Sequence, residues 1–222
     1  MKSQLSLAAG ILAAALVASP AQATLVYDID EFSDYGAYGE VTFNFAMPST
    51  DQFRVTVGIE NTTSTGIGGA LTSLAFDVPD NSSNWQIVNQ GSYNFTLLHD
   101  TSLAPFGLFD ACLATGQNCQ GGTVSEGVAA GDSATIVLSA TSSVYQSAAA
   151  FEAAMETVLN EHETALCAKF QGLRPGDKSD KVCGEPSEGG GGPGPGLPEP
   201  ISAGLLGLGL TGLFLARRRQ AA

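Results

Sequence analysis

The chain has 222 residues and a formal net charge of −13, with 22 acidic residues against 9 basic ones. Because nucleic acid and anionic lipid surfaces would repel so acidic a protein, the composition argues against both as partners. Hydrophobic residues make up 44% of the chain, which is enough to build the core of an ordinary folded domain.

The first 23 residues have the parts of a secretory signal peptide. Lys2 supplies one positive charge, residues 5–17 form a short apolar run, and Ala21 and Ala23 form an Ala-x-Ala end. This order predicts export and cleavage after Ala23, so that the mature chain begins at Thr24. A buried N-terminal helix is the alternative, but it would need a polar face, which residues 5–17 lack.

Residues 24–184 are about the size of one domain, and most of this region alternates apolar and polar residues. Such a period of two predicts half-buried strands, and Gly-, Pro- and Asn-containing turns separate them. Several short strands at this spacing predict a mainly β ectodomain, an antiparallel β-sandwich of jelly-roll-like form. The expected strands cover residues 41–46, 53–60, 71–78, 85–88, 93–98 and 134–139.

A different pattern follows between residues 147 and 161. Phe151, Met155, Val158 and Leu159 fall on one helical stripe, which predicts a short amphipathic helix that caps one end of the β-domain. Residues 165–173 are expected to return as a late strand.

The four cysteines all lie in the exported region, where an oxidising compartment permits disulfides. Three pairings are possible, and we favour Cys112 with Cys119 and Cys167 with Cys183 because each pair is close in sequence. A metal site built on these cysteines is disfavoured, since the sequence has no Cys-x-x-Cys and no histidine beside a cysteine.

One acidic cluster is a weak candidate for calcium. Asp28, Asp30, Glu31 and Asp34 could supply oxygen ligands, but their spacing fits no EF-hand loop. A solvated acidic strand end is the simpler interpretation, so neither a metal nor another cofactor is expected.

No catalytic motif is present in the sequence. It contains no Gly-x-Ser-x-Gly and no His-Glu-x-x-His, and His99 and His162 are interpreted as a surface turn residue and a residue at the end of the helix. A secreted hydrolase would need a cleft with two carboxylates at a working separation, which a sequence cannot show. We therefore expect a protein that is not an enzyme.

The aromatic residues allow an alternative role, carbohydrate binding or adhesion. A platform for sugars could use Trp85 together with four of the tyrosines. The sequence favours a buried Trp85 and an exposed Tyr35-Gly36-Ala37-Tyr38 segment. The tyrosines are Tyr27, Tyr35, Tyr38 and Tyr93.

The C-terminal part begins with a Gly- and Pro-rich linker at residues 185–197 and continues with Pro198-Glu199-Pro200. Sixteen uncharged residues, 201–216, follow, and Arg217, Arg218 and Arg219 come next. As a helix these sixteen residues would reach about 24 Å, less than the roughly 30 Å of a hydrocarbon core. The segment is thus expected to act as a temporary transmembrane anchor with its arginines in the cytoplasm. A plain single-pass anchor is the alternative.

Residues 198–222 resemble the PEP-CTERM sorting signal, although Leu197 and Ile201 stand where Val or Ile and Ser are more usual. The resemblance implies processing near Pro198-Glu199-Pro200 by an exosortase, a membrane enzyme of Gram-negative bacteria that make exopolysaccharide. It also implies delivery to the cell surface or the extracellular matrix, with extracellular polysaccharide or biofilm as the surroundings. Without the signal peptide and the residues after Pro200, five basic residues face 22 acidic ones, a formal charge of −17.

Overall fold

The computed structural model describes residues 24–187, which form eleven strands, one α-helix and one short 3₁₀ turn. The predicted signal peptide and the sorting tail lie outside the described residues. No helix within residues 24–187 is both long and apolar enough to cross a membrane. The elements are β1 (Thr24–Glu31), β2 (Gly39–Ser49), β3 (Gln52–Glu60), β4 (Gly68–Phe76), β5 (Ser83–Asn89), β6 (Thr96–Ser102), β7 (Leu108–Ala114), η1 (Val124–Glu126), β8 (Val128–Ala129), β9 (Ser133–Thr141), α1 (Ala148–Leu159), β10 (Leu166–Leu173) and β11 (Lys178–Pro186).

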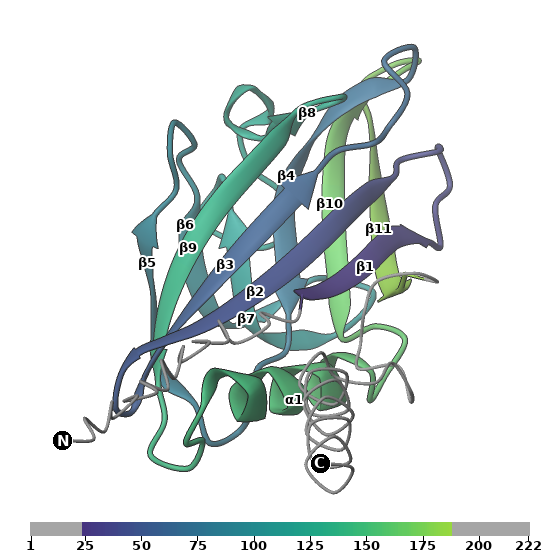
Figure 1. Cartoon of the computed structure of the whole chain (residues 1–222). Coiled ribbons are helices and arrows are strands. Elements are labelled where there is room, and N and C mark those ends of the chain that lie inside the picture. Colours follow the sequence, from purple (N-terminus) through teal and green to yellow (C-terminus); the bar gives the residue numbers. More distant parts are fainter. Residues whose placement is uncertain (1–23, 188–222) are drawn as a thin grey trace, which may run out of the picture.

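All strands belong to one antiparallel sheet that curls almost into a barrel (Figure 1). Its hydrogen-bonded order is β5-β9-β3-β2-β1-β11-β10-β4-β7-β6, and the short β8 pairs with β4. The prediction of a mainly β domain is confirmed. All strands form one continuous sheet, however, whereas a sandwich of two packed sheets was expected. The reason is the β1–β11 pairing, which joins the first strand to the last and links the two halves into one sheet.

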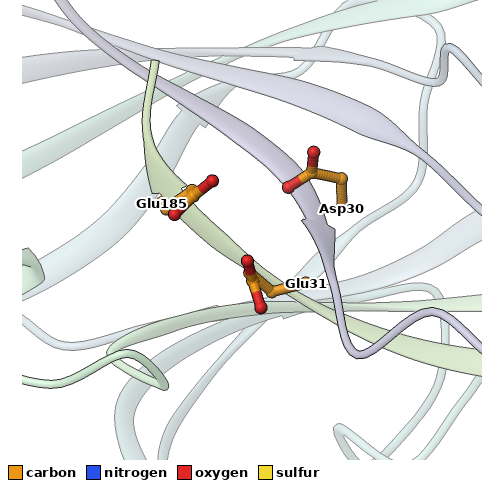
Figure 2. A group of neighbouring side chains, drawn as sticks. All are labelled: Asp30, Glu31 and Glu185. Carbon is orange, nitrogen blue, oxygen red and sulfur yellow. The ribbon is translucent and has the colours of Figure 1, made fainter. Parts of the chain in front are cut away.

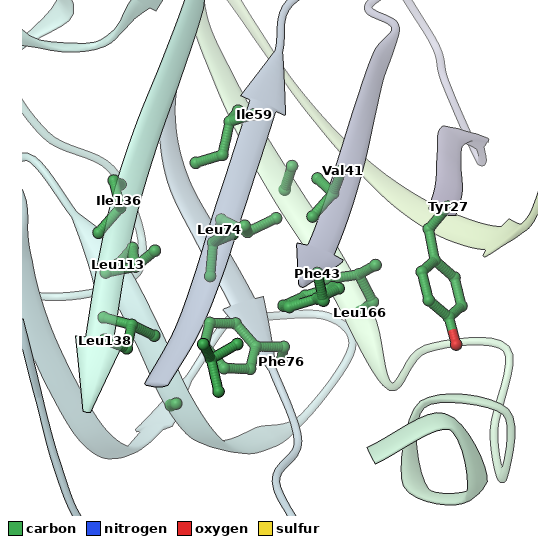
Figure 3. Close-up of a cluster of buried hydrophobic side chains, with 14 of the residues drawn as sticks. Tyr27, Val41, Phe43, Ile59, Leu74, Phe76, Leu113, Ile136, Leu138 and Leu166 are labelled. Atoms are coloured by element: carbon green, nitrogen blue, oxygen red, sulfur yellow. The ribbon is translucent and has the colours of Figure 1, made fainter. Parts of the chain in front are cut away.

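The main hydrophobic core lies inside the curled sheet. It is formed by the apolar residues that alternate with polar residues along each strand. Val41 and Phe43 of β2 point inward, and their ladder partners are Ile59 and Val57 of β3. Figure 3 shows Val41, Phe43 and Ile59 projecting into the interior together with Leu74 and Phe76 of β4. The polar residues between them face solvent, so these strands behave as the alternating pattern predicted.

Helix α1 lies across one end of the curled sheet, as predicted (Figure 1). Ser147 is its N-cap, and the Ser147 hydroxyl accepts a hydrogen bond from the Ala150 amide at 3.1 Å. Phe151 enters the core from the helix and stacks on Phe53 with ring centroids 4.4 Å apart. Tyr145 and Trp85 also contact the Phe151 ring, so an aromatic cluster closes this end.

A second, smaller core lies on the outer face of β4, β7, β10 and β11. It contains both disulfides, Cys112–Cys119 and Cys167–Cys183, which are the pairs favoured from the sequence. Cys167 and Cys183 are direct ladder partners, so the second disulfide fastens β10 to β11.

Two lysines hold the loops that cover this outer core. Lys169 donates to the Gln120 carbonyl, and Lys181 donates to the Ala104 carbonyl and to Gln120 Oε1. Burial lowers the pKa of Lys169, and the neighbouring Lys181 lowers it further. The β6–β7 loop and the segment after β7 are therefore fixed against the sheet, which gives the groove described below one firm wall.

Four strands were not assigned from the sequence, namely β1, β7, the short β8 and β11. The strand expected at residues 93–98 lies further along, as β6, because residues 90–95 form a turn in which the Tyr93 amide donates to the Gln90 carbonyl. β11 also extends through Pro186, two residues into the expected linker, because Glu185 and Pro186 still pair with β1.

Candidate functional site

The calcium candidate predicted from the sequence is divided in the structure. Asp30 and Glu31 gather with Glu185, and their carboxylate oxygens all lie within 4.8 Å of one another (Figure 2). A break in the β1–β11 register between Ile29 and Glu31 brings Asp30 to the same side as Glu31. Asp28 instead accepts a 2.6 Å hydrogen bond from the Ser187 hydroxyl. Asp34 belongs to the loop after β1 and is not part of this group.

Glu185 was not among the predicted residues, because it was assigned to the linker and reaches the cluster only through the pairing of β11 with β1. Asp30 and Glu185 are exposed, and Glu31 is half-buried. Three carboxylate oxygens at this separation could serve as ligands for a hard cation, but exposed acidic groups also occur without one.

The loop between β1 and β2 is held by one buried carboxylate, that of Asp180 on β11. Asp180 is only 4% exposed, and Oδ2 accepts hydrogen bonds from the Ser33 hydroxyl and the Tyr35 amide, each at 2.9 Å. Its Oδ1 accepts from the Asp34 amide at 3.2 Å. At the far end of the loop, the Tyr38 amide donates to the Thr63 hydroxyl oxygen at 2.9 Å. The loop is therefore fixed at both ends.

This loop carries exposed aromatic side chains. Tyr35 and Tyr38 are 43% and 44% exposed, and Phe32 is 51% exposed. The structure confirms the predicted exposure of Tyr35 and Tyr38, but Ala37, in the same segment, is buried in the core. Phe32 was missed, although its position next to the acidic cluster and two Tyr residues was a usable signal.

The other aromatic residues considered for a sugar platform do not join this loop. Trp85 is buried, and its Nε1 donates to the Ser82 hydroxyl oxygen at 2.9 Å. Tyr27 lies in the core, where burial and the nearby Glu156 raise the pKa of its phenol. The Tyr93 hydroxyl donates to the Ser133 carbonyl at 2.9 Å. The prediction of a single platform made of all five residues is therefore wrong. Only Tyr35 and Tyr38 lie together on this exposed loop.

A groove of about 620 Å³ opens beside the loop, between Phe32 and the β6–β7 loop. The rings of Phe32 and Phe106 lie 5.8 Å apart at their centroids and tilt by 40°. Pro105 adds to the apolar wall, and the polar lining comes from Ser33, Asp34, Ser179, Asp180 and Lys181. The groove thus combines aromatic faces with hydrogen-bonding groups.

A second groove, of about 570 Å³, lies between the β4–β5 connection and helix α1. Asp77 and Asp110 line it together with Glu161 and His162. Burial raises the pKa of Asp77 to about 6, and the charges of Asp110 and Glu161 also raise it, while a hydrogen bond from the Asp110 amide and the charge of His162 act against them. A cleft with more than one carboxylate therefore exists, which the sequence could not show.

His99 and His162 are far apart in sequence, but each lines a groove beside the β4–β5 connection. His162 follows the end of α1, and its carbonyl accepts from the Ala165 amide at 3.0 Å. His99 lies within β6 rather than in a turn, opposite Ala111. It lines a third groove, of about 390 Å³, with Asp100 and Asp110.

No protein-family model matches the chain, and no curated protein is significantly similar to it.

Proposed function

We propose that the chain is an exported cell-surface or extracellular-matrix protein that an exosortase processes near Pro198-Glu199-Pro200. The paired state of all four cysteines carries this proposal, because disulfides indicate an oxidising, extracytoplasmic compartment. The sorting residues themselves, with Arg217, Arg218 and Arg219 behind them, lie outside the described part.

In this proposal the membrane anchor is temporary and the ectodomain has a structural or interaction role in exopolysaccharide or biofilm. The β-barrel-like body supplies a disulfide-fastened unit that the linker separates from the membrane. The chemistry of processing belongs to the exosortase, so no catalytic residue and no cofactor is assigned to this chain. Glu199 is the ionic group of the sorting motif.

Intact mass spectrometry of the protein from native cells tests the proposal. The expected mass corresponds to a chain that starts at Thr24 and ends near Pro200, with or without an attached group. A Glu199→Ala variant should accumulate in the membrane uncut, whereas Glu188→Ala, a change of the same kind in the linker, should be processed normally. A wild-type mass that extends through Arg219 would show a permanent single-pass anchor and overturn the proposal.

The second candidate function is carbohydrate binding or adhesion at the same surface. The exposure of Tyr35 and Tyr38 on a loop fixed by Asp180 favours it, because a rigid, exposed aromatic loop lowers the entropic cost of binding. Its test is binding of a glycan panel by the wild-type protein, with loss of binding in Tyr35→Ala and Tyr38→Ala. Equal binding by both variants would contradict it.

A further inference from the structure

We propose that the groove walled by the adjoining rings of Phe32 and Phe106 is a binding site for a neutral saccharide chain. This inference rests on the second candidate function and names the residues and the ligand class. The ligand then binds in a groove that the sequence did not reveal, and not primarily on Tyr35 and Tyr38.

The shape and lining of the groove suit a sugar ring. Its volume of about 620 Å³ is within the range of small-molecule sites, and its mouth is open along the surface. The Phe32 and Phe106 rings are tilted toward one another by 40° and form an apolar surface. The C–H face of a pyranose ring is complementary to the negative face of an aromatic ring. A chain that continues beyond one ring can leave the groove without a steric barrier.

Phe32 is held in a conformation that a bulky residue seldom adopts. Its φ of 68° lies in the left-handed region, and its side chain is nonetheless 51% exposed. Such strain persists only where the surroundings enforce it. Here the Asp180 carboxylate fixes the next three residues, because it accepts hydrogen bonds from the Ser33 hydroxyl and from the Asp34 and Tyr35 amides. The ring is thus placed in the groove wall before any ligand arrives.

Asp34 and Ser179 supply the polar contacts. Both side chains are exposed, and within residues 24–187 neither the Asp34 carboxylate nor the Ser179 hydroxyl has a hydrogen-bond partner. A carboxylate accepts and a hydroxyl both donates and accepts, which matches the vicinal hydroxyls of a sugar. The other polar lining residues already have partners: Lys181 donates to Ala104 and Gln120, and the Ser33 hydroxyl donates to Asp180.

Charge selects a neutral ligand over an acidic one. The mature chain carries a formal charge of −17, and Asp30 and Glu31 lie just before Phe32. A polyanionic chain of uronic acids would meet this field at the groove mouth and be repelled. Neutral hydroxyl groups meet no such barrier.

The test measures binding of soluble neutral glucans and mannans, with alginate as the polyanionic comparator, to the protein recovered from the cell surface. Phe106→Ala should weaken binding about tenfold, since it removes one aromatic face of the groove. Phe106→Tyr should keep the affinity, because the ring is retained. Val144→Ala, which trims a 55% exposed apolar residue outside the groove, is the matched control.

A second measurement follows the aromatic NMR signals of the wild-type protein during titration with the tightest glycan, so the test does not depend on the folding of a variant. Shifts in the Phe32 and Phe106 ring signals are expected. Glycan binding that is lost in Tyr38→Ala but unchanged in Phe106→Ala would overturn the groove and leave carbohydrate binding standing. The absence of binding to any neutral glycan would overturn both, and tighter binding of alginate would overturn the ligand class.

Discussion

Asp77 and Asp110 fasten the ends of β4 and β7 to each other through their side chains. The Val78 amide donates to Asp110 Oδ2 at 2.9 Å, and the Asp110 amide donates to Asp77 Oδ1 at 3.4 Å. The regular ladder between these strands ends at Phe76 and Ala111, so the two carboxylates continue the pairing where backbone hydrogen bonds stop.

This arrangement predicts a pH-dependent stability that Asp77→Asn removes. Burial raises the folded-state pKa of Asp77 from 3.8 to about 6, so the folded state holds the proton more tightly than the unfolded state. Its contribution is complete below pH 3.8 and is lost as the pH rises through about 6. At pH 7.5 the variant should be more stable by about 1 kcal/mol, a value reduced for the partial exposure of the carboxyl.

Urea unfolding at pH 4 and pH 7.5 checks the Asp77 prediction, and the gain should shrink toward pH 4. Asp80→Asn, an exposed change on the same connection, should behave like the wild type at both pH values. A loss of stability in Asp77→Asn at pH 7.5 would contradict the prediction and show that the ionised carboxylate is needed.

The parts of the fold that sequence reasoning found are those that local pattern determines. Apolar and polar residues alternate along β2 and β3 because one face of these strands is buried and the other faces solvent. Helix α1 was found from one apolar stripe, and the disulfides from cysteines that lie close in sequence. β7 was missed because it is buried on both sides over Ala111–Ala114, which erases a period of two.

The closure of the sheet depends on contacts that no local pattern contains. β1 and β11 are about 150 residues apart in sequence, and their pairing brings Glu185 to Asp30 and Asp180 to the β1–β2 loop. The acidic cluster and the Phe32 groove both follow from this pairing. The sequence shows which acidic and aromatic residues are present, but the register of the β1–β11 pairing determines which of them come into contact.

The two disulfides should contribute different amounts of stability. Replacing Cys167 and Cys183 by alanine should lower the free energy of unfolding by about 3 kcal/mol, because this link closes the longer loop. Replacing Cys112 and Cys119 should cost less, about 2 kcal/mol on the same entropic basis. Guanidinium unfolding of the two double variants measures both values. A smaller loss for the Cys167–Cys183 pair would show that loop closure does not dominate.

The acidic cluster predicts that Asp30→Asn stabilises the protein at low ionic strength. Removing one of three carboxylates within 4.8 Å reduces repulsion, so the melting temperature should rise, and 0.5 M salt should diminish the gain. Asp51→Asn, in the β2–β3 turn, is the control and should have little effect. If millimolar calcium raises the melting temperature of the wild type but not of Asp30→Asn, the cluster holds a cation and the repulsion argument is wrong.

Ser73 on β4 offers a final test of how the outer core is built. Its hydroxyl oxygen is buried and lacks a hydrogen-bond partner within the described residues, and Ser73 lies opposite Lys169 in the ladder. A buried hydroxyl without a partner costs free energy, so Ser73→Ala should raise the stability by about 1 kcal/mol. Thr72→Val is the contrasting variant. Its hydroxyl donates to Gln171 Oε1 at 2.9 Å, and its loss should destabilise the protein. Thermal unfolding of both variants measures these changes in stability. A clear loss of stability in Ser73→Ala would mean that the Ser73 hydroxyl has a hydrogen-bond partner in solution.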